Sequence, residues 1–339
     1  MNNLGVVLLN MGGPTSLDSV RPFLENLFLD REIISFGPVE FARTPLAKFI
    51  AKRRAEKVRE NYRMIGGKSP IAELSRAQAD ALHTRLAHHY GQDLPIRVEV
   101  GFSYWHPFIA EALENLRRDG FTNVFLMPLY PHYSKTTTGS CFKTWRDLHR
   151  RHGNRLFRVQ SVKAYPLEAD FIDAINERID EGLQRFPEER RGQVHLLFSA
   201  HGTPVSLVEE GDPYSHQIRT TMDEIMRRRG HDLPHHLSFQ SKVGPAKWLT
   251  PDTVDKTKEL AASGVRDLLV IPIAFVTDHI ETLHELGIEL REEAEEAGIE
   301  HFHVMPALNS SERYINALAV QIIRRMERRA ALASRSVIS

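Results

Sequence analysis

The chain has 339 residues, of which 42% are hydrophobic and 26% charged, and its 44 basic side chains balance 44 acidic ones. This length exceeds what one hydrophobic core usually organises, and it predicts one large α/β unit or two closely packed lobes. The zero net charge argues against nucleic acid as a partner, because no basic field is present to recruit it. The single cysteine, Cys141, excludes an intramolecular disulfide and cannot alone hold an iron–sulfur cluster, so we expect a reducing, cytoplasmic environment.

The chain begins with a short apolar run rather than a targeting segment. The stretch MNNLGVVLLNMGGP breaks after about six apolar residues, which is the length of a buried strand, and no basic region precedes it. No stretch of the sequence approaches the length of a membrane span. We therefore predict a strand at 4–10 and no secretion signal.

Further β-branched runs that end in Gly, Pro or Ser recur between long amphipathic segments, which is typical of parallel strands covered by helices. The predicted strands are 4–10, 96–102, 122–128, 194–200, 235–241 and 267–273. They form two sets of three, since VVLLNMGGP resembles LLFSAHGTP, VEVGFSYWHP resembles LSFQSKVGP, and VFLMPLYPHYS resembles LLVIPIAFVTDHIE. The predicted fold is α/β, with two similar Rossmann-like lobes, each a parallel β-sheet flanked by helices.

The repeat also suggests how the chain divides. We place an N-terminal lobe at 1–155, a C-terminal lobe at 156–330 and a tail at 331–339. Ligands of open parallel sheets bind beyond the carboxyl ends of the strands, so the six strand-end loops are expected to converge on one cleft between the lobes.

The segment 32–54, EIISFGPVEFARTPLAKFIAKRR, joins several apolar side chains to a basic end. One interpretation is a loop that packs on the core. The other is an apolar lip that admits a flat hydrophobic substrate and touches a membrane surface, as amphipathic basic segments can. The sequence leaves both open.

Two chemically important residues follow predicted strands. In LLFSAHGTPVSLVEEGDPY a buried strand delivers His201 to a Gly-Thr-Pro turn, and in IPIAFVTDHIETLHELGIEL a strand is followed by Asp278, His279 and Glu281. A histidine alone at a strand end is more often structural than catalytic, but a carboxylate partner reverses that preference. We predict that Asp278 is the N-cap of a helix, that Glu281 lies in its first turn, and that His201 and Glu281 face each other across the cleft.

Glu285 and Glu289 continue from Glu281 at intervals of four residues, so the three carboxylates are expected to line one face of a helix. A solvated acidic stripe explains this spacing about as well as a path for cations does. Raised carboxylate pKa values would favour the path. His279 and His284 do not form the HExxH zinc signature, and neither GxGxxG nor GxxxxGK[ST] occurs, so a hydrolytic zinc site and two nucleotide-binding sites lose their main support.

Six motifs together resemble the ferrochelatase family nearly from end to end. They are LLNMGGP at 8–14, RRAEKVRENYRMIGGKSPI at 53–71, LYPHYSKTTTGS at 129–140, FSAHGTP with GDPY, QSKVGPAKWLTP at 240–251, and FVTDHIETLHEL at 275–286. The resemblance implies the two-lobed fold of class II chelatases. It also implies a lyase that inserts Fe(II) into protoporphyrin IX to form protohaem, at the last step of haem biosynthesis.

The resemblance further implies roles for individual residues. His201 and Glu281 would be the catalytic and metal-binding pair, supported by Asp278, Glu285 and Glu289. The implied porphyrin-binding residues are Met11, Arg54, Tyr62, Ser69, Tyr130, Trp248 and His279.

The same resemblance sets the expected partners. Protoporphyrin IX and ferrous iron are the implied substrates, with no tightly bound cofactor and, as in cluster-free bacterial members, no iron–sulfur cluster. A cytoplasmic protein is expected. Peripheral contact with the inner membrane and the choice between monomer and homodimer both stay open. Two alternatives also stay open. One is a coproporphyrin ferrochelatase. Met11 argues against it, because such enzymes commonly have tyrosine at this position. The other is a non-catalytic haem or porphyrin carrier.

Overall fold

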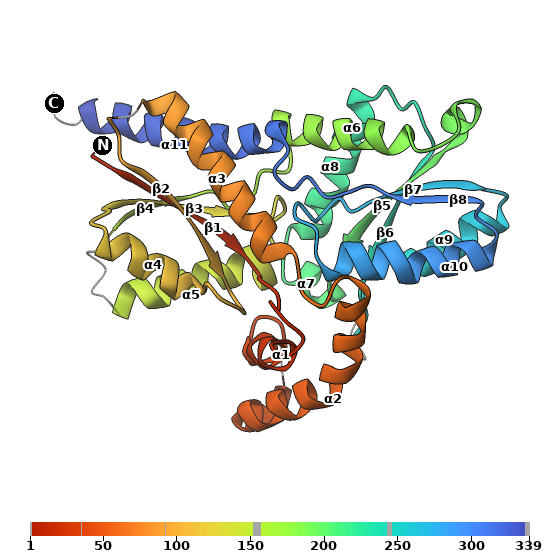
Figure 1. Ribbon diagram of the computed structural model, residues 1–339, viewed down its shortest axis with the longest axis horizontal. Coiled ribbons are helices and arrows are strands. Elements are labelled where there is room, and N and C mark those ends of the chain that lie inside the picture. Colours follow the sequence, from red (N-terminus) through yellow and green to blue (C-terminus); the bar gives the residue numbers. More distant parts are fainter. Residues whose placement is uncertain (1, 35, 92, 152–156, 243–245, 336–339) are drawn as a thin grey trace. The chain divides into compact units, whose positions relative to one another are not determined.

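A computed structural model describes residues 2–34, 36–91, 93–151, 157–242 and 246–335. The chain folds into two compact units, each of which is described by itself. The first unit contains 1–130, 135–165 and 310–339, and the second contains 131–134 and 166–309. Figure 1 shows the helices and strands of both.

The first unit is built on a four-stranded parallel sheet in the order β2-β1-β3-β4. Its strands are β1 (Leu4–Asn10), β2 (Ile96–Phe102), β3 (Asn123–Pro128) and β4 (Arg158–Ser161). Every residue of the central strand β1 is buried, which explains why this strand reads as a continuous apolar run instead of alternating with polar residues.

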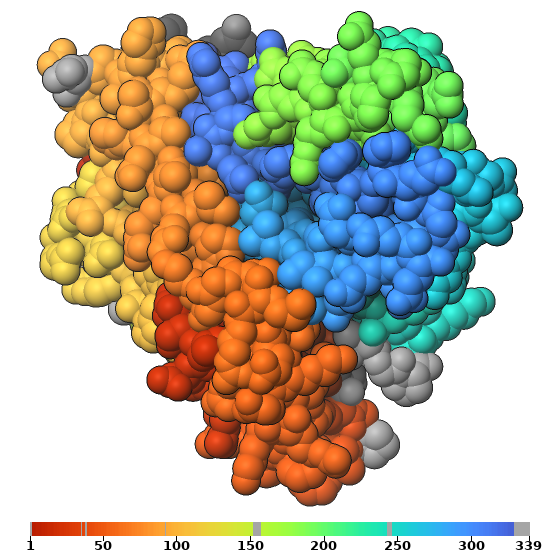
Figure 2. Space-filling view, turned by 45° about the vertical axis from the view of Figure 1, so that its right-hand side comes forward, coloured from red at the N-terminus to blue at the C-terminus, as the bar shows by residue number. Residues whose placement is uncertain are grey.

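Helices cover both faces of this sheet. The helices of this unit are α1 (Val20–Leu29), α2 (Arg43–Met64), α3 (Ile71–Tyr90), α4 (Ile109–Arg118), α5 (Ser140–Arg151) and α11 (Glu312–Arg335), with a 3-10 helix at Gly37–Ala42 and a π-helical turn at Lys135–Gly139. Of these, α1 and α2 pack against each other and do not cover a face of the sheet. One core joins the sheet to α4 and α5 through Val7, Leu113 and Trp145. On the other side, α3 and α11 lie against each other, orange beside dark blue in Figure 2.

The second unit repeats this plan, with a parallel sheet in the order β6-β5-β7-β8. Its strands are β5 (His195–His201), β6 (His235–Gln240), β7 (Asp267–Ile271) and β8 (His301–Val304). Its helices are α6 (Ala169–Leu183), α7 (Val205–Glu209), α8 (Tyr214–Arg228), α9 (Thr253–Ala262) and α10 (Leu290–Ala297), with a 3-10 helix at Glu188–Gln193 and a π-helix at Glu281–Glu289. A core that includes Leu197, Leu268, Leu286 and Leu290 joins the sheet to the π-helix and α10.

The predicted fold class is confirmed, because the two sheets are parallel and share one strand order. All six predicted strands exist within a residue or two of their predicted bounds. Two further strands, β4 and β8, were not predicted; each has four residues and lies at the edge of its sheet. Only one of those eight residues, Phe302, is buried, so neither strand carries an apolar run that would mark it.

The division of the chain differs from the predicted boundaries. The predicted boundary at 155/156 falls on 152–156, which lie outside the described residues, and α11 groups with the first unit although 156–330 was assigned to the second lobe. The reason is specific contacts on α11. Tyr314 bonds Tyr165 at 3.0 Å between hydroxyl oxygens, and Asn316 accepts from Arg85 at 3.0 Å. Of the predicted tail at 331–339, the structure describes 331–335, as the end of α11.

Among the described helices, none combines the length and apolar character that crossing a bilayer requires.

Candidate active site

His201 is the last residue of β5, and the residues around it fix its position. Five consecutive residues before it are buried, and the backbone N–H of Gly202 donates to the carbonyl oxygen of Gln240 at 2.7 Å. A Cβ at Gly202 would lie only 2.7 Å from that oxygen, so the close approach of the turn to β6 requires glycine.

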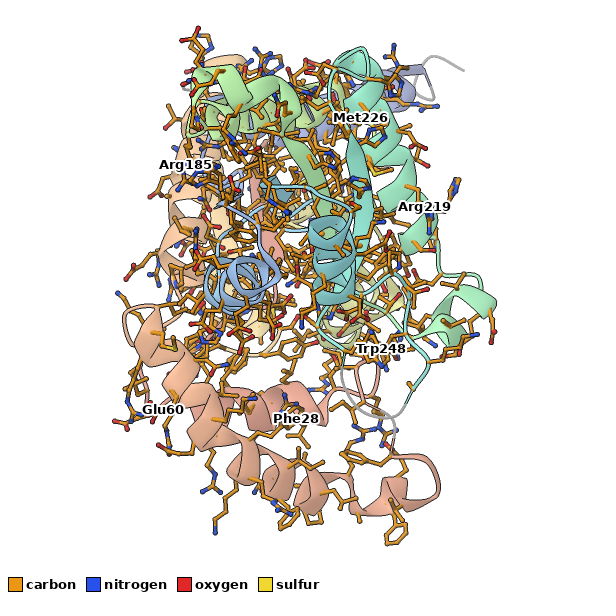
Figure 3. All side chains as sticks on the ribbon, turned by 90° about the vertical axis from the view of Figure 1, so that its right-hand side faces the viewer. Phe28, Glu60, Arg185, Arg219, Met226 and Trp248 are labelled. Atoms are coloured by element: carbon orange, nitrogen blue, oxygen red, sulfur yellow. The ribbon has the colours of Figure 1, made fainter. Side chains whose placement is uncertain are left out.

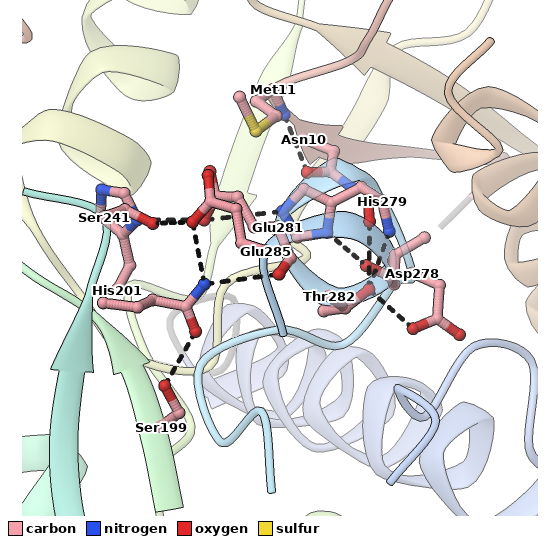
Figure 4. A network of polar contacts seen from close by, with 12 residues as sticks. Asn10, Met11, Ser199, His201, Ser241, Asp278, His279, Glu281, Thr282 and Glu285 are labelled. Atoms are coloured by element: carbon pink, nitrogen blue, oxygen red, sulfur yellow. Dashed lines mark hydrogen bonds and ion pairs between the residues drawn. The ribbon is translucent and has the colours of Figure 1, made fainter. Parts of the chain in front are cut away.

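Glu281 opens the π-helix that follows β7. Because β5 and β7 are parallel neighbours, their carboxyl ends meet at one edge of the sheet, and His201 and Glu281 come together there. His201 Nδ1 and Glu281 Oε2 are 3.0 Å apart (Figure 4). The prediction that the two residues face each other across a cleft is therefore wrong. Both belong to the second unit, and a macrocycle cannot fit between two side chains that are hydrogen-bonded to each other.

Opposite charges define this pair. Burial alone would lower the pKa of His201, but the Glu281 carboxylate beside it raises that pKa above the ordinary value. Burial alone would raise the pKa of Glu281, yet the charges and hydrogen bonds of His201 and His279 hold it well below its usual range. Each group of the pair thus stabilises the charged form of the other, while the His201 side chain keeps 39% of its surface exposed.

His279 is the second imidazole at this edge of the sheet. Its Nδ1 lies 3.0 Å from the carbonyl oxygen of Thr277, so Nδ1 carries the proton and Nε2 faces Glu281 Oε2 at 3.8 Å. Burial opposes protonation of His279, but Glu281 outweighs it and raises the pKa of this histidine.

Asp278 does not cap the helix in the way we predicted. The helix starts after Ile280, and the Asp278 carboxylate accepts a hydrogen bond from the Thr282 hydroxyl at 2.9 Å instead of from a backbone N–H of the first turn. The prediction that Glu281 lies in the first turn is confirmed. Asp278 holds the turn that presents His279 and Glu281.

Glu285 and Glu289 separate into two environments. The Glu285 carboxylate accepts from Ser241 and from Gln240 Nε2, and burial together with the Glu281 charge raises its pKa to about 7. The Glu289 side chain is 51% exposed, with Oε1 at 3.7 Å from His284 Nδ1. A raised pKa was the property expected of a cation path, and it is found at Glu285.

Trp248 lies in the loop after β6, labelled in Figure 3. The backbone N–H of Leu249 donates to Thr203 at 3.1 Å, and the N–H of Val205 donates to Lys247 at 2.8 Å. These bonds fasten the loop to the turn that follows His201, so Trp248 stands beside the predicted histidine. Part of the QSKVGP motif, 243–245, lies outside the described residues.

The first unit carries the other predicted porphyrin-binding residues. Met11 follows β1, and its backbone N–H donates to the Asn10 side chain at 2.8 Å. Ser69 is buried, and its Cβ lies 2.6 Å from where a Cβ on Gly13 would stand, so the glycine turn lets Ser69 approach the end of β1. The structure therefore brings Met11 and Ser69 to the same strand end.

Three predicted residues sit farther along this unit. Arg54 is exposed on α2, with its guanidinium carbon 5.7 Å from the centre of the Phe28 ring on α1. Tyr62 is buried, and Tyr130 packs against the core beneath α4 and α5. Of these three, only Arg54 has an exposed side chain.

Four residues near His201 and Glu281 were not among the predicted site residues. Tyr214 of the GDPY motif is buried, and burial first and the Glu281 charge second raise its phenol pKa far above the ordinary value. Gln240 and Ser241 bond Glu285, and Asn309 bonds Asp278. The GDPY and QSKVGP motifs contain Tyr214, Gln240 and Ser241, but no motif in the sequence contains Asn309. Within the described residues, no group of three or more His, Cys, Asp or Glu is arranged to hold a metal ion.

Comparison with known proteins gives one family. The sequence pattern of the ferrochelatase family matches residues 3–326. A ferrochelatase from Trichodesmium erythraeum is 44% identical over 321 residues, covering 94% of this chain and 81% of the relative. One from Geotalea uraniireducens is 44% identical over 314 residues, covering 93% and 95%.

Among solved structures, SirB from Bacillus subtilis with Fe3+ is similar in fold, with a TM-score of 0.55, 11% identity and 94% of each chain covered. A multi-domain protein from Deinococcus radiodurans with structural similarity to chelatases gives a TM-score of 0.50 and 16% identity, covering 94% of this chain and 55% of that one. At these identities the likeness establishes the chelatase fold alone.

Proposed function

Because this chain belongs to the ferrochelatase family, and is thus a lyase of haem biosynthesis that inserts ferrous iron into a porphyrin, we propose that His201 and Glu281 carry out the metal insertion. The observation that supports this most is their 3.0 Å contact at the carboxyl edge of the second sheet. Membership in an enzyme family sets aside the carrier alternative.

The proposed chemistry follows from which ring nitrogen is engaged. His201 Nδ1 is committed to Glu281, so Nε2 is the nitrogen that meets the substrate. Metal insertion replaces two pyrrole protons with a divalent cation, and an imidazole next to a carboxylate suits both a borderline cation such as Fe(II) and the acceptance of a proton. As a metal ligand His201 would be a neutral imidazole, with Nδ1 bonded to Glu281 and Nε2 facing the cation.

Glu281 and Glu285 then differ in their tasks. The low pKa of Glu281 makes it a weak base and a steady anion, which orients His201 and attracts iron. The pKa of Glu285, about 7, matches that of an efficient proton acceptor near neutrality. We assign proton removal from this edge of the sheet to Glu285, with Asp278 and His279 as supports.

Two variants test the pair. His201→Ala and Glu281→Gln should each abolish insertion of Fe(II) or Zn(II), followed by porphyrin absorbance under anaerobic conditions, while the near-ultraviolet circular dichroism of the fold is retained. Glu289→Gln is the matched control, since its carboxylate is half exposed on the same helix. Near-normal turnover in both site variants would refute the assignment.

The second proposal concerns which porphyrin the enzyme takes as its substrate. We infer protoporphyrin IX as the substrate, held by Met11, Arg54, Tyr62, Ser69, Tyr130, Trp248 and His279, with coproporphyrin as the alternative. Met11 supports protoporphyrin, because a thioether offers the ring an apolar, polarisable contact. Parallel assays with the two porphyrins decide between them, and a higher kcat/KM for coproporphyrin would reverse the inference.

We also propose that insertion proceeds without an iron–sulfur cluster or another resident cofactor. Cys141 is the only cysteine in the sequence, and its thiol is buried 3.2 Å from the Ser103 hydroxyl. Burial raises the pKa of Cys141 to about 12, so this thiol does not supply a thiolate ligand.

Segment 32–54 supports a peripheral membrane contact for an otherwise cytoplasmic protein. Phe41 is 90% exposed and Phe49 56% exposed, while Phe36 is half-buried beneath the Arg43 guanidinium at 4.9 Å. Lys52 on α2 is also exposed and adds positive charge to the same segment. The segment therefore packs on the protein at Phe36 and exposes apolar side chains at Phe41 and Phe49.

Vesicle binding tests this contact. Phe41→Ser with Phe49→Ser should reduce sedimentation with vesicles that contain anionic lipid, because about 25 cal/mol is lost for each Å² of apolar surface no longer buried. Leu167→Ser is the control, since Leu167 is 51% exposed in the second unit. Equal sedimentation of the parent and the Phe variants would contradict the proposal.

A further inference from the structure

Asn309 lies 31 residues from Asp278 in the sequence, yet the two residues exchange a pair of hydrogen bonds. The backbone N–H of Asp278 donates to Asn309 Oδ1 at 3.0 Å, and Asn309 Nδ2 donates to Asp278 Oδ2 at 2.8 Å. One end of the amide accepts and the other donates, and a carboxylate in the same place could supply only the acceptor.

The backbone of Asn309 contributes a third bond to the same turn. Its N–H donates to the carbonyl oxygen of Val276 at 2.8 Å, and its φ is +47°. This left-handed conformation is uncommon for residues other than glycine and is tolerated best by asparagine and aspartate. Asn309 is therefore suited to this place by its backbone and by its side chain.

The turn that Asn309 holds leads directly into the proposed site. Asp278 Oδ1 accepts from the Thr282 hydroxyl at 2.9 Å, and the Thr282 oxygen accepts the backbone N–H of His279 at 3.1 Å, as Figure 4 shows. Glu281 lies between His279 and Thr282 in the sequence, at the start of the π-helix. These bonds link Asn309 through Asp278 and Thr282 to the backbone of His279, two residues before Glu281.

We propose that Asn309 is a positioning residue for metal insertion, which fixes the turn at 276–279 and so the aim of Glu281 at His201. The inference rests on the proposed role of Glu281. It adds a residue from beyond β8, at the point where the chain leaves the second unit for α11 of the first.

The isosteric variant Asn309→Asp tests this. It removes the donor and sets a second carboxylate against Asp278 Oδ2, while a residue tolerant of positive φ is kept. We expect kcat to fall about 10–100-fold, the range for lost orienting partners of metal ligands, and the KM for Zn(II) or Fe(II) to rise while the KM for porphyrin is unchanged. A smaller folded fraction alone would lower kcat without raising the metal KM.

Exchange of the two groups, Asp278→Asn with Asn309→Asp, recreates the donor and acceptor in reversed places and should recover most of the lost turnover. Asn316→Asp is the control. It makes the same chemical change on α11 while keeping an oxygen for Arg85, and we expect parental kinetics.

Two results would overturn the proposal: parental kcat and metal KM in Asn309→Asp, or an exchanged pair no faster than that single variant. Glu281→Gln separates this outcome from a failure of the proposed function. If Glu281→Gln is inactive and Asn309→Asp is fully active, the positioning role alone is wrong. If Glu281→Gln is active, the function proposed for the pair is wrong.

Discussion

Glu285 and Glu289 show how far residue spacing can mislead. Their interval of four residues from Glu281 predicted one acidic face, and the sequence treated the three carboxylates alike. In the structure, Ser241 and Gln240 hold Glu285, whereas Glu289 is half exposed. The difference arises from β6, whose end reaches one carboxylate and not the other.

We expect Glu285→Gln to raise the apparent KM for Fe(II) or Zn(II) about tenfold or more, with a smaller effect on the KM for porphyrin. The pKa of Glu285 is about 7, so its charge, and with it the attraction for the cation, grows as the pH rises through 7. The glutamine variant should lose that pH dependence. Initial rates between pH 6 and 8 measure it, and an unchanged metal KM together with an unchanged kcat would instead indicate that Glu285 is only structural.

At the scale of elements, the π-helix at Glu281–Glu289 is the feature that no sequence pattern predicted. A π-helix closes each hydrogen bond one residue later than an α-helix, and such segments are frequent at functional sites. The amphipathic pattern of the sequence predicts a helix, but it does not distinguish an α-helix from a π-helix. The π-helix becomes apparent only in the folded chain, where the 276–279 turn and α10 hold the two ends of the segment.

Deletion of Gly287 should let this segment close as an α-helix, because it removes one residue from the π register. One residue corresponds to about 100° of helix rotation, so Glu281 would turn away from His201. We expect insertion activity to be lost while far-ultraviolet circular dichroism keeps its helical signal. The control is deletion of exposed Gly192, where a Cβ would meet no neighbouring atom within 4 Å. Full activity after the Gly287 deletion would show that the π register is dispensable.

At the scale of the whole molecule, buried histidines link stability to pH. Burial lowers the pKa of His132 to about 3, and its Nε2 lies 2.9 Å from the Thr221 hydroxyl. That hydroxyl donates to the carbonyl oxygen of Pro166, so His132 Nε2 is the donor to it, and the lowered pKa keeps the ring neutral. His201 behaves in the opposite way, because its pKa is raised.

The signs follow from these directions. His132 contributes stability above about pH 6.5, its unfolded pKa, and loses it as the pH falls towards 3, at up to about 1.4 kcal/mol per pH unit. His201 contributes stability below about pH 6.5 and loses it as the pH rises through its raised pKa. We expect His132→Gln, which keeps a donor for Thr221, to flatten the fall in urea midpoint between pH 6.5 and 4.5. Parallel curves for variant and parent would contradict the linkage.

The sequence by itself determined the fold class, the six long strands and the duplicated plan, because buried parallel strands must be continuous apolar runs that end in turn residues. It also marked His201 and Glu281, since each follows such a strand. Tertiary structure alone decided that the two residues touch, because contact depends on β5 and β7 being neighbours in the sheet. It likewise decided the return of α11 to the first unit and the bond from Asn309 to Asp278, which join residues that no local pattern connects.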